Sequence, residues 1–165
     1  MTTIFTVGHS RHMAEHFETL LGSVAVELLV DVRSQPVSKW APHFGRVELA
    51  QTLAALSVDY VFLGDRLGGR PGDRAFYRED GTVDYALRAA APDFVAGIER
   101  LAALSRDRRT AILCAEEDPA RCHRRLLVAP ALMRLGVAVV HVRGDGRLEP
   151  ETQMATLQQL DLFRA

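Results

Sequence analysis

The stretch Val26-Glu27-Leu28-Leu29-Val30-Asp31-Val32 decides the fold. It is an almost continuous apolar run, broken only by Glu27 and Asp31. A strand buried on both faces of a sheet shows this pattern, whereas a strand with one face in water alternates apolar and polar residues. The run therefore predicts a central strand of a parallel sheet that is covered by helices on both sides.

Outward from this stretch, strand patterns and helix patterns alternate along the chain. The expected strands cover residues 3–7, 26–32, 58–63, 110–114 and 137–142. Apolar residues at helical spacing predict helices near residues 13–21, 47–56, 84–105, 118–135 and 150–162. The alternation predicts an α/β fold, a single three-layer α/β/α domain over residues 1–165 with a mostly parallel sheet of about five strands.

Composition narrows the function classes. The 165 residues are 48% hydrophobic and 25% charged, as in an ordinary globular protein. The net charge of -1 provides no overall field to hold a polyanion, so a nucleic-acid partner would have to rest on a local cluster of arginines. The first residues lack a basic segment followed by a long apolar run, and no stretch is apolar enough to span a bilayer, so we expect a cytoplasmic protein without a membrane partner.

Polar residues cluster directly after the predicted strands. In parallel sheets, ligands bind beyond the carboxyl ends of the strands, because the connecting loops meet there. The polar stretches that follow the first four strands cover residues 8–11, 31–34, 64–69 and 114–118. We expect these stretches to converge on one edge of the sheet and to form one binding or catalytic site.

Five short motifs carry a family resemblance. They are Gly8-His9-Ser10, Asp31-Val32-Arg33-Ser34, Leu67-Gly68-Gly69, Cys114-Ala115-Glu116 and Cys122-His123-Arg124. With these five motifs in this order, the chain resembles the family named domain of unknown function 488. The resemblance implies a shared fold and a shared site, without an established reaction. The Arg11-His12 pair departs from the pattern, because the family often has a small polar residue there.

Four residues are candidates for catalysis. Glu116 lies two residues past a buried strand, where a carboxylate can act as a general acid or base, although it can equally be a solvated or capping carboxylate. His9 or His123 would share the proton transfer. Cys122 is expected in the first turns of a helix capped by Asp118, where the helix dipole lowers a thiol pKa; a buried core cysteine is the alternative.

The remaining candidates would bind the substrate. Arg33 and Arg124 are expected to form a forked clamp for a phosphate or carboxylate, unless Asp31 or Glu116 neutralises Arg33. Ser10 either caps the next helix or contacts the ligand, and His9 has a structural alternative as a buried partner of Asp31. The substrate-binding candidates are Gly8, Ser10, Asp31, Arg33, Ser34, Cys114 and Arg124.

These residues favour an enzyme that acts by acid-base chemistry on a phosphorylated, nucleotide-like or nucleic-acid substrate. A non-enzymatic module that binds a nucleotide or a protein partner is the alternative, and the sequence does not decide between them. A rhodanese-like sulfurtransferase or phosphatase is disfavoured for two reasons. Acidic residues 116–118 lie where its anion would bind, and Arg121 lies one residue too far from Cys114 for the usual phosphatase spacing.

Zinc-binding residue types are also present. Cys114, Cys122, His123 and His9 have suitable side chains, but their spacing matches no standard zinc motif. A structural disulfide is improbable for a single cysteine pair in a cytosolic protein. We therefore predict no metal and no cofactor, while the question of a metal at Cys114, Cys122 and His123, like the oligomeric state, stays open.

Overall fold

The protein is built around one six-stranded sheet. We describe residues 1–152 of a computed structural model. The strands lie in the order β3-β2-β4-β1-β5-β6, and only β6 runs antiparallel to its neighbour within this part of the chain. Their bounds are Thr3–Gly8 for β1, Leu28–Asp31 for β2, Asp59–Phe62 for β3, Thr110–Cys114 for β4, Ala138–Val142 for β5 and Leu148–Pro150 for β6. The predicted α/β fold with a mostly parallel sheet is confirmed.

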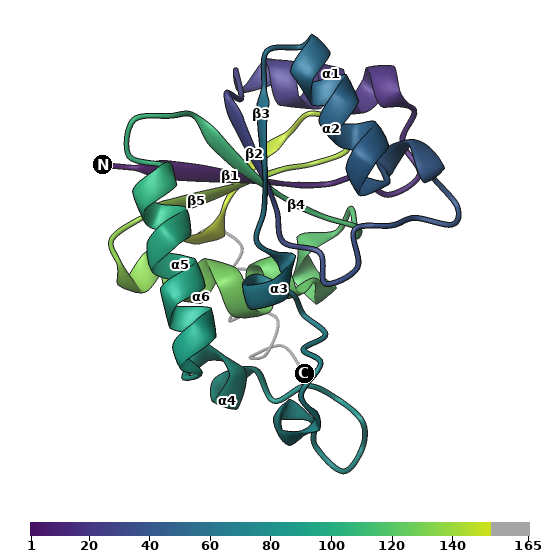
Figure 1. The fold of residues 1–165 in the computed structure, drawn as a ribbon. Helices are drawn as coiled ribbons and strands as arrows, with labels where there is room; N and C mark the ends of the chain where they lie inside the picture. The colour runs from purple at the N-terminus through teal and green to yellow at the C-terminus, as the bar shows by residue number, and fades with distance from the viewer. Residues whose placement is uncertain (153–165) are drawn as a thin grey trace, which may run out of the picture.

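Helices cover both faces of the sheet. Helices α1 and α2 lie together on one side of the sheet, and α3, α5 and α6 lie on the other (Figure 1). The bounds are Ala14–Ser23 for α1, Arg46–Ala55 for α2, Gly64–Leu67 for α3, Tyr85–Ala89 for α4, Pro92–Leu104 for α5 and Ala129–Arg134 for α6. Among residues 1–152, no helix is long and apolar enough to cross a membrane.

Two apolar cores flank the sheet, because successive residues of a strand point to opposite faces. In β4, Ile112 packs into the core formed with α5 and α6, whereas Ala111 and Leu113 pack into the core formed with α1 and α2. The same alternation holds in β2, where Leu28 and Leu29 enter opposite cores. The apolar run that predicted a doubly covered strand therefore has the expected environment.

Three details differ from the predicted elements. The expected helix over 118–135 is interrupted: a 3₁₀ turn covers Pro119–Arg121, a single π-helical turn covers Arg124–Val128, and α6 follows. The connection over 64–81 contains the short helix α3. Pro150 ends β6, Glu151 and Thr152 directly after it are helical, and the rest of the helix expected over 150–162 lies outside the described residues.

The topology marks one edge as the place for a ligand. The strands on either side of β4 are β2 and β1, which lead into α2 and α1 on one face of the sheet. β4 instead leads into the π-helical turn and α6, which pack on the opposite face. Loops that leave neighbouring strands toward opposite faces open a crevice between them, and open α/β sheets bind ligands in such crevices.

Candidate functional site

A cavity of about 320 Å³ lies at this edge, between the loops that follow β2, β3 and β4. Six of the residues predicted for the site line it: Arg33, Ser34, Cys114, Glu116, Cys122 and His123. The other predicted residues are not part of its lining: Gly8, His9, Ser10, Asp31 and Arg124. The structure thus brings the later motifs together around one cavity and places the first motif beside it.

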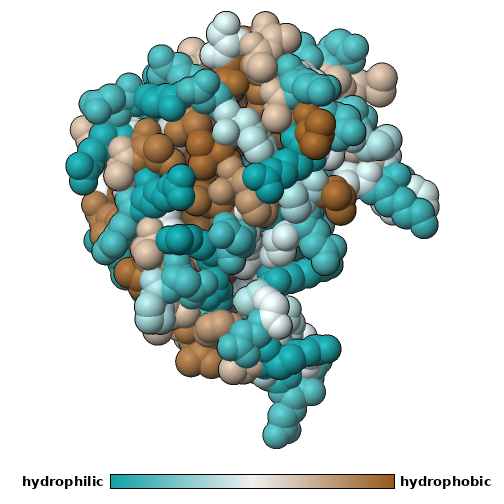
Figure 2. Space-filling model, in the orientation of Figure 1, coloured by the Kyte–Doolittle hydropathy of each residue, from teal (hydrophilic) through white to brown (hydrophobic). Residues whose placement is uncertain are grey.

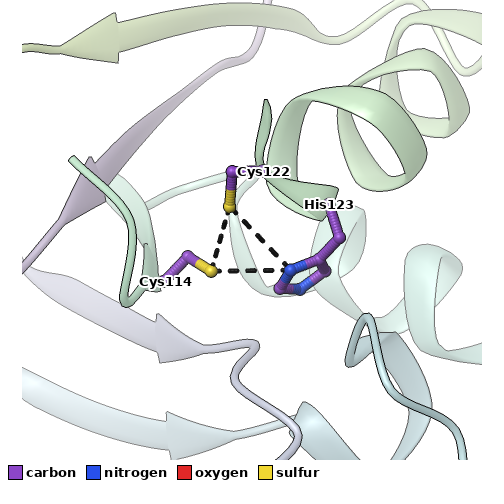
Figure 3. A group of neighbouring side chains, drawn as sticks. All are labelled: Cys114, Cys122 and His123. Carbon is purple, nitrogen blue, oxygen red and sulfur yellow. Dashed lines mark hydrogen bonds between the residues drawn. The ribbon is translucent and has the colours of Figure 1, made fainter. Parts of the chain in front are cut away.

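Cys114, Cys122 and His123 form a compact buried cluster on this cavity, and their side chains point toward one another (Figure 3). The two sulfur atoms are 3.0 Å apart, and the Cys114 Sγ lies 3.5 Å from the Nδ1 of His123. Cys122 follows the 3₁₀ turn in an extended conformation with φ -105° and ψ 141°, so it does not lie within a helix. The predicted helix-dipole effect on Cys122 is therefore wrong.

The pKa values of the two thiols are shifted in opposite directions. The hydrogen bond that the Cys122 thiol donates to the Cys114 sulfur lowers the pKa of Cys114 to about 7, against the effect of burial. The same hydrogen bond, together with burial, raises the pKa of Cys122 to about 12. Cys114, which the sequence assigned to substrate binding, is therefore the more acidic thiol, whereas Cys122 was predicted to be the reactive one.

Of the three consecutive acidic residues after β4, only Glu116 lines the cavity. Glu117 forms an ion pair with Arg143 at 3.0 Å, which holds the pKa of the Glu117 carboxyl below its ordinary value. Asp118 accepts a hydrogen bond from the backbone N–H of Ala120 and caps the 3₁₀ turn. Glu116 is exposed, and its carboxylate forms no hydrogen bond or ion pair with the residues that the structure describes.

Arg33 is held inside the protein rather than presented to a ligand. Its Nε and Nη2 donate to the two carboxylate oxygens of Asp31 at 2.9 and 2.7 Å, and its Nη1 donates to the backbone carbonyl of Phe44 at 2.8 Å. Tyr60 donates its hydroxyl hydrogen to Asp31 at 2.6 Å, and burial together with this bond raises the pKa of Tyr60. Asp31 is fully buried and does not line the cavity.

His9 completes this buried network. Its Nδ1 donates to the backbone carbonyl of Ser10 at 2.8 Å, which leaves its Nε2 to accept a hydrogen bond from Arg33 at 3.2 Å. Burial lowers the pKa of His9 to about 4, and the charge of Arg33 acts in the same direction. His9 is therefore a buried neutral residue bonded to Arg33; it does not line the cavity, and the alternative bond to Asp31 is not present.

Arg124 braces the loop after β4. Its side chain is fully buried, its Nη2 donates to the carbonyl of Glu117 at 2.7 Å, and its Nη1 donates to the carbonyl of Glu116. Its Nε donates to the hydroxyl of Thr6 at 3.1 Å. Because the guanidinium groups of Arg33 and Arg124 both donate their hydrogen bonds to groups within the chain, this pair does not form the predicted forked clamp for an anion.

The serines of the predicted site support the loops. Ser34 accepts a hydrogen bond from the backbone N–H of Arg70 at 2.9 Å, which ties the loop after β3 to the loop after β2. Ser10 has a positive φ of 45°, and its N–H donates to the carbonyl of Ala115 at 2.8 Å. Helix α1 begins after Met13, which makes no side-chain capping bond, so Ser10 does not cap this helix, and this one of the two roles expected for Ser10 is wrong.

Gly8 permits the close packing of this region. A Cβ atom at Gly8 would lie 1.7 Å from the carbonyl oxygen of Glu116, where no atom fits. We expect Gly8→Ala to lower the free energy of unfolding by about 1–3 kcal/mol, because the backbone at Glu116 must move. The measurement is urea denaturation followed by circular dichroism.

Gly22 in α1 provides the matched control, since a Cβ there would meet nothing within 4 Å. Gly22→Ala should stabilise the protein by about 0.5–1 kcal/mol, because alanine loses less backbone freedom in a helix. Equal stability of Gly8→Ala and the wild type would show that the backbone at Glu116 can move without lowering the free energy of unfolding.

Two arginines at the cavity were missed from the sequence. Arg70 and Arg121 line it, and both are exposed. Arg70 lies at the start of the segment between α3 and α4, which projects from the body of the molecule and carries mostly hydrophilic residues (Figures 1 and 2). One signal was available: Arg70 directly follows the Leu67-Gly68-Gly69 motif.

Comparison with protein families identifies the chain. The family model described as "Domain of unknown function DUF488" matches residues 13–130. The chain belongs to this family. The matched region holds four of the five motifs that carried the resemblance, and Gly8-His9-Ser10 precedes it. No curated protein and no solved structure matches the chain.

Within the family's matched region lie all the residues that line the cavity, from Arg33 to His123. The Cys114-Ala115-Glu116 and Cys122-His123-Arg124 motifs provide the buried cluster, the exposed carboxylate and the loop brace. The Asp31-Val32-Arg33-Ser34 motif provides the internal ion pair and the anchor for Arg70. Some residues of the family motifs therefore line the cavity, and others hold the surrounding loops in place.

Proposed function

We propose that the cavity binds a small phosphorylated or nucleotide-like ligand and that Glu116 exchanges a proton with it. Arg70 and Arg121 carry this proposal, because both line the cavity and neither forms an ion pair with a carboxylate of residues 1–152. Guanidinium groups bind phosphate through paired N–H···O bonds. With a net charge of -1, attraction for an anion has to come from such local groups.

Glu116 supplies the acid-base group of the proposal. It is the acidic residue that lines the cavity, since Glu117 is paired with Arg143 and Asp118 caps a turn. A general acid or base must reach the proton that it transfers, and an exposed carboxylate on the cavity wall satisfies this requirement. In this proposal Glu116 takes a proton from the bound ligand, or from a water molecule that attacks it, and later returns the proton to the product.

Binding is tested by calorimetric titration of AMP and, separately, of inorganic phosphate. We expect Arg70→Gln and Arg121→Gln each to weaken AMP binding by roughly 10–100-fold, since a hydrogen bond to a charged group contributes about 1.5–3 kcal/mol. Arg100→Gln is the matched control: Arg100 is exposed on α5, outside the cavity lining, and its loss should leave the affinity unchanged. Equal affinities for all three variants would contradict the proposed site.

Catalysis is tested by following phosphate release from a panel of nucleotides and sugar phosphates. Glu116→Gln should lower turnover by about a hundredfold and keep AMP affinity, because the amide cannot exchange the proton. Full turnover in this variant would remove Glu116 from the mechanism. A wild-type protein that binds AMP but turns over no member of the panel would establish the binding module instead.

A further inference from the structure

We infer that Cys114, Cys122 and His123 bind one Zn²⁺ ion at the buried end of the cavity. Their ligand atoms all lie within 4.8 Å of one another. Zinc is held by thiolate and imidazole at about 2.3 and 2.0–2.1 Å, so a tetrahedral site places two sulfurs about 3.8 Å apart and a sulfur and a nitrogen about 3.6 Å apart. The two sulfur–nitrogen distances, 3.5 and 3.9 Å, match this geometry.

The two sulfur atoms lie close together without a covalent bond between them. The distance between them is 3.0 Å, well beyond the roughly 2.05 Å of a disulfide. Binding zinc requires this distance to widen to about 3.8 Å. Cys122 has an extended backbone and lies between the 3₁₀ turn and the π-helical turn.

His123 is oriented as a metal ligand. Its Nε2 donates to the backbone carbonyl of Val32 at 3.0 Å, so the ring proton is held on the side away from the cysteines. The lone pair of Nδ1 then points toward both sulfur atoms (Figure 3). Histidine ligands of metals usually donate their other N–H to a carbonyl or carboxylate in this way, which fixes the tautomer.

The surroundings select the metal and its coordination. Two cysteines and one histidine are soft and borderline ligands, which favour zinc and exclude Mg²⁺ and Ca²⁺ as good occupants. The three side chains are at most 9% exposed, yet all three line the cavity. Three protein ligands with a fourth position open to a cavity are typical of catalytic zinc sites, whereas structural sites have four protein ligands.

The fold supplies what the sequence spacing did not. Cys114 and Cys122 are eight residues apart, and the 3₁₀ turn over Pro119–Arg121 folds the chain back so that their sulfurs meet. The prediction of no metal rested on the absence of a standard zinc motif. His9, the fourth residue considered for a metal, is bonded to Ser10 and Arg33 instead.

A catalytic use of the metal rests on the proposed function, whereas metal binding itself does not. In the open position, zinc would coordinate a water molecule and favour its loss of a proton, which Glu116 accepts. The resulting hydroxide attacks the bound phosphate ester, a new phosphorus–oxygen bond forms and the bond to the leaving oxygen breaks. The proton held by Glu116 then passes to that oxygen.

The test uses the whole protein, purified under reducing conditions without chelators. We expect one zinc per chain by elemental analysis. After removal of the zinc, titration with Co²⁺ should produce a thiolate-to-cobalt charge-transfer band and the intense visible bands of a tetrahedral centre. Zinc should also slow the alkylation of both cysteines in the wild type, a measurement that needs no variant.

Ligand variants locate the site. Cys122→Ser and His123→Gln should each weaken zinc binding by roughly a hundredfold or more, because even losing an outer partner of a ligand costs about 10–100-fold. His16→Gln, which removes an exposed histidine bonded to Gly144, is the matched control and should keep full affinity. Circular dichroism checks that each variant folds.

Two results would overturn the inference: a reduced wild type that binds neither zinc nor cobalt, or tight zinc binding that survives in both ligand variants. AMP titration of the zinc-free protein separates this inference from the proposed function. Loss of zinc binding with AMP binding retained removes only the metal site. Zinc binding without AMP binding removes only the proposed ligand.

Discussion

Asp31→Ala is expected to lower the free energy of unfolding by about 3–5 kcal/mol, the usual cost of leaving a buried charge without its partner. Asp31 and Arg33 are 0% and 4% exposed, and three hydrogen bonds join them, two from the guanidinium and one from the backbone N–H of Arg33. The substitution also removes the acceptor for the hydroxyl of Tyr60. Urea denaturation of the variant and the wild type measures the difference.

Two further variants sharpen this measurement. Asp145→Ala is the matched control, because Asp145 and Arg147 form an ion pair that is largely exposed to solvent, and the midpoint should hardly change. The double variant Asp31→Leu, Arg33→Met removes both charges and should recover most of the lost stability. If the single and the double variants were equally unstable, the unpaired guanidinium would not be the cause.

The second large effect is a loss of stability in mild acid that depends on His9. Its pKa is about 4 in the folded protein, below the ordinary value of about 6.5. As the pH falls from about 6.5 to 4, the unfolded chain takes up a proton that folded His9 does not, so folding stability falls; below pH 4 both states are protonated. The full effect is about 3 kcal/mol.

His9→Gln tests this prediction. The amide oxygen of glutamine can still accept from Arg33, but the side chain does not titrate, so the variant should lose less stability than the wild type between pH 6.5 and 4. His16→Gln is the control, since His16 is exposed on α1. Parallel stability curves for the wild type and His9→Gln would contradict the prediction.

The fold was predictable because each buried strand corresponds to a local apolar run in the sequence. The run over 26–32 contains β2, and the expected strand at 110–114 coincides with β4. The strand β6 was missed because it has only three residues and ends in proline, so its sequence cannot be distinguished from that of a turn. The split of the 118–135 helix was missed because Pro119 starts a 3₁₀ turn as readily as an α-helix.

The site was only partly predictable, because residue positions follow from topology while bonding partners depend on tertiary contacts. That Glu116 and Cys114 share an edge with Ser34 follows from the parallel sheet. That Arg124 spends its donors on the carbonyls of Glu116 and Glu117 depends on the path of the loop after β4, which no local pattern encodes. The roles of arginines were therefore the least predictable part.

The two borders of the sheet bear on how the protein avoids association through its backbone. Within residues 1–152, the outer strands are β3 and β6, of four and three residues. Asp59 begins β3 and is paired with Arg108, and Pro150 ends β6 without an N–H to donate. Short borders that carry charge or proline give an incoming strand few amides to pair with, which is how natural sheets resist growth into fibrils.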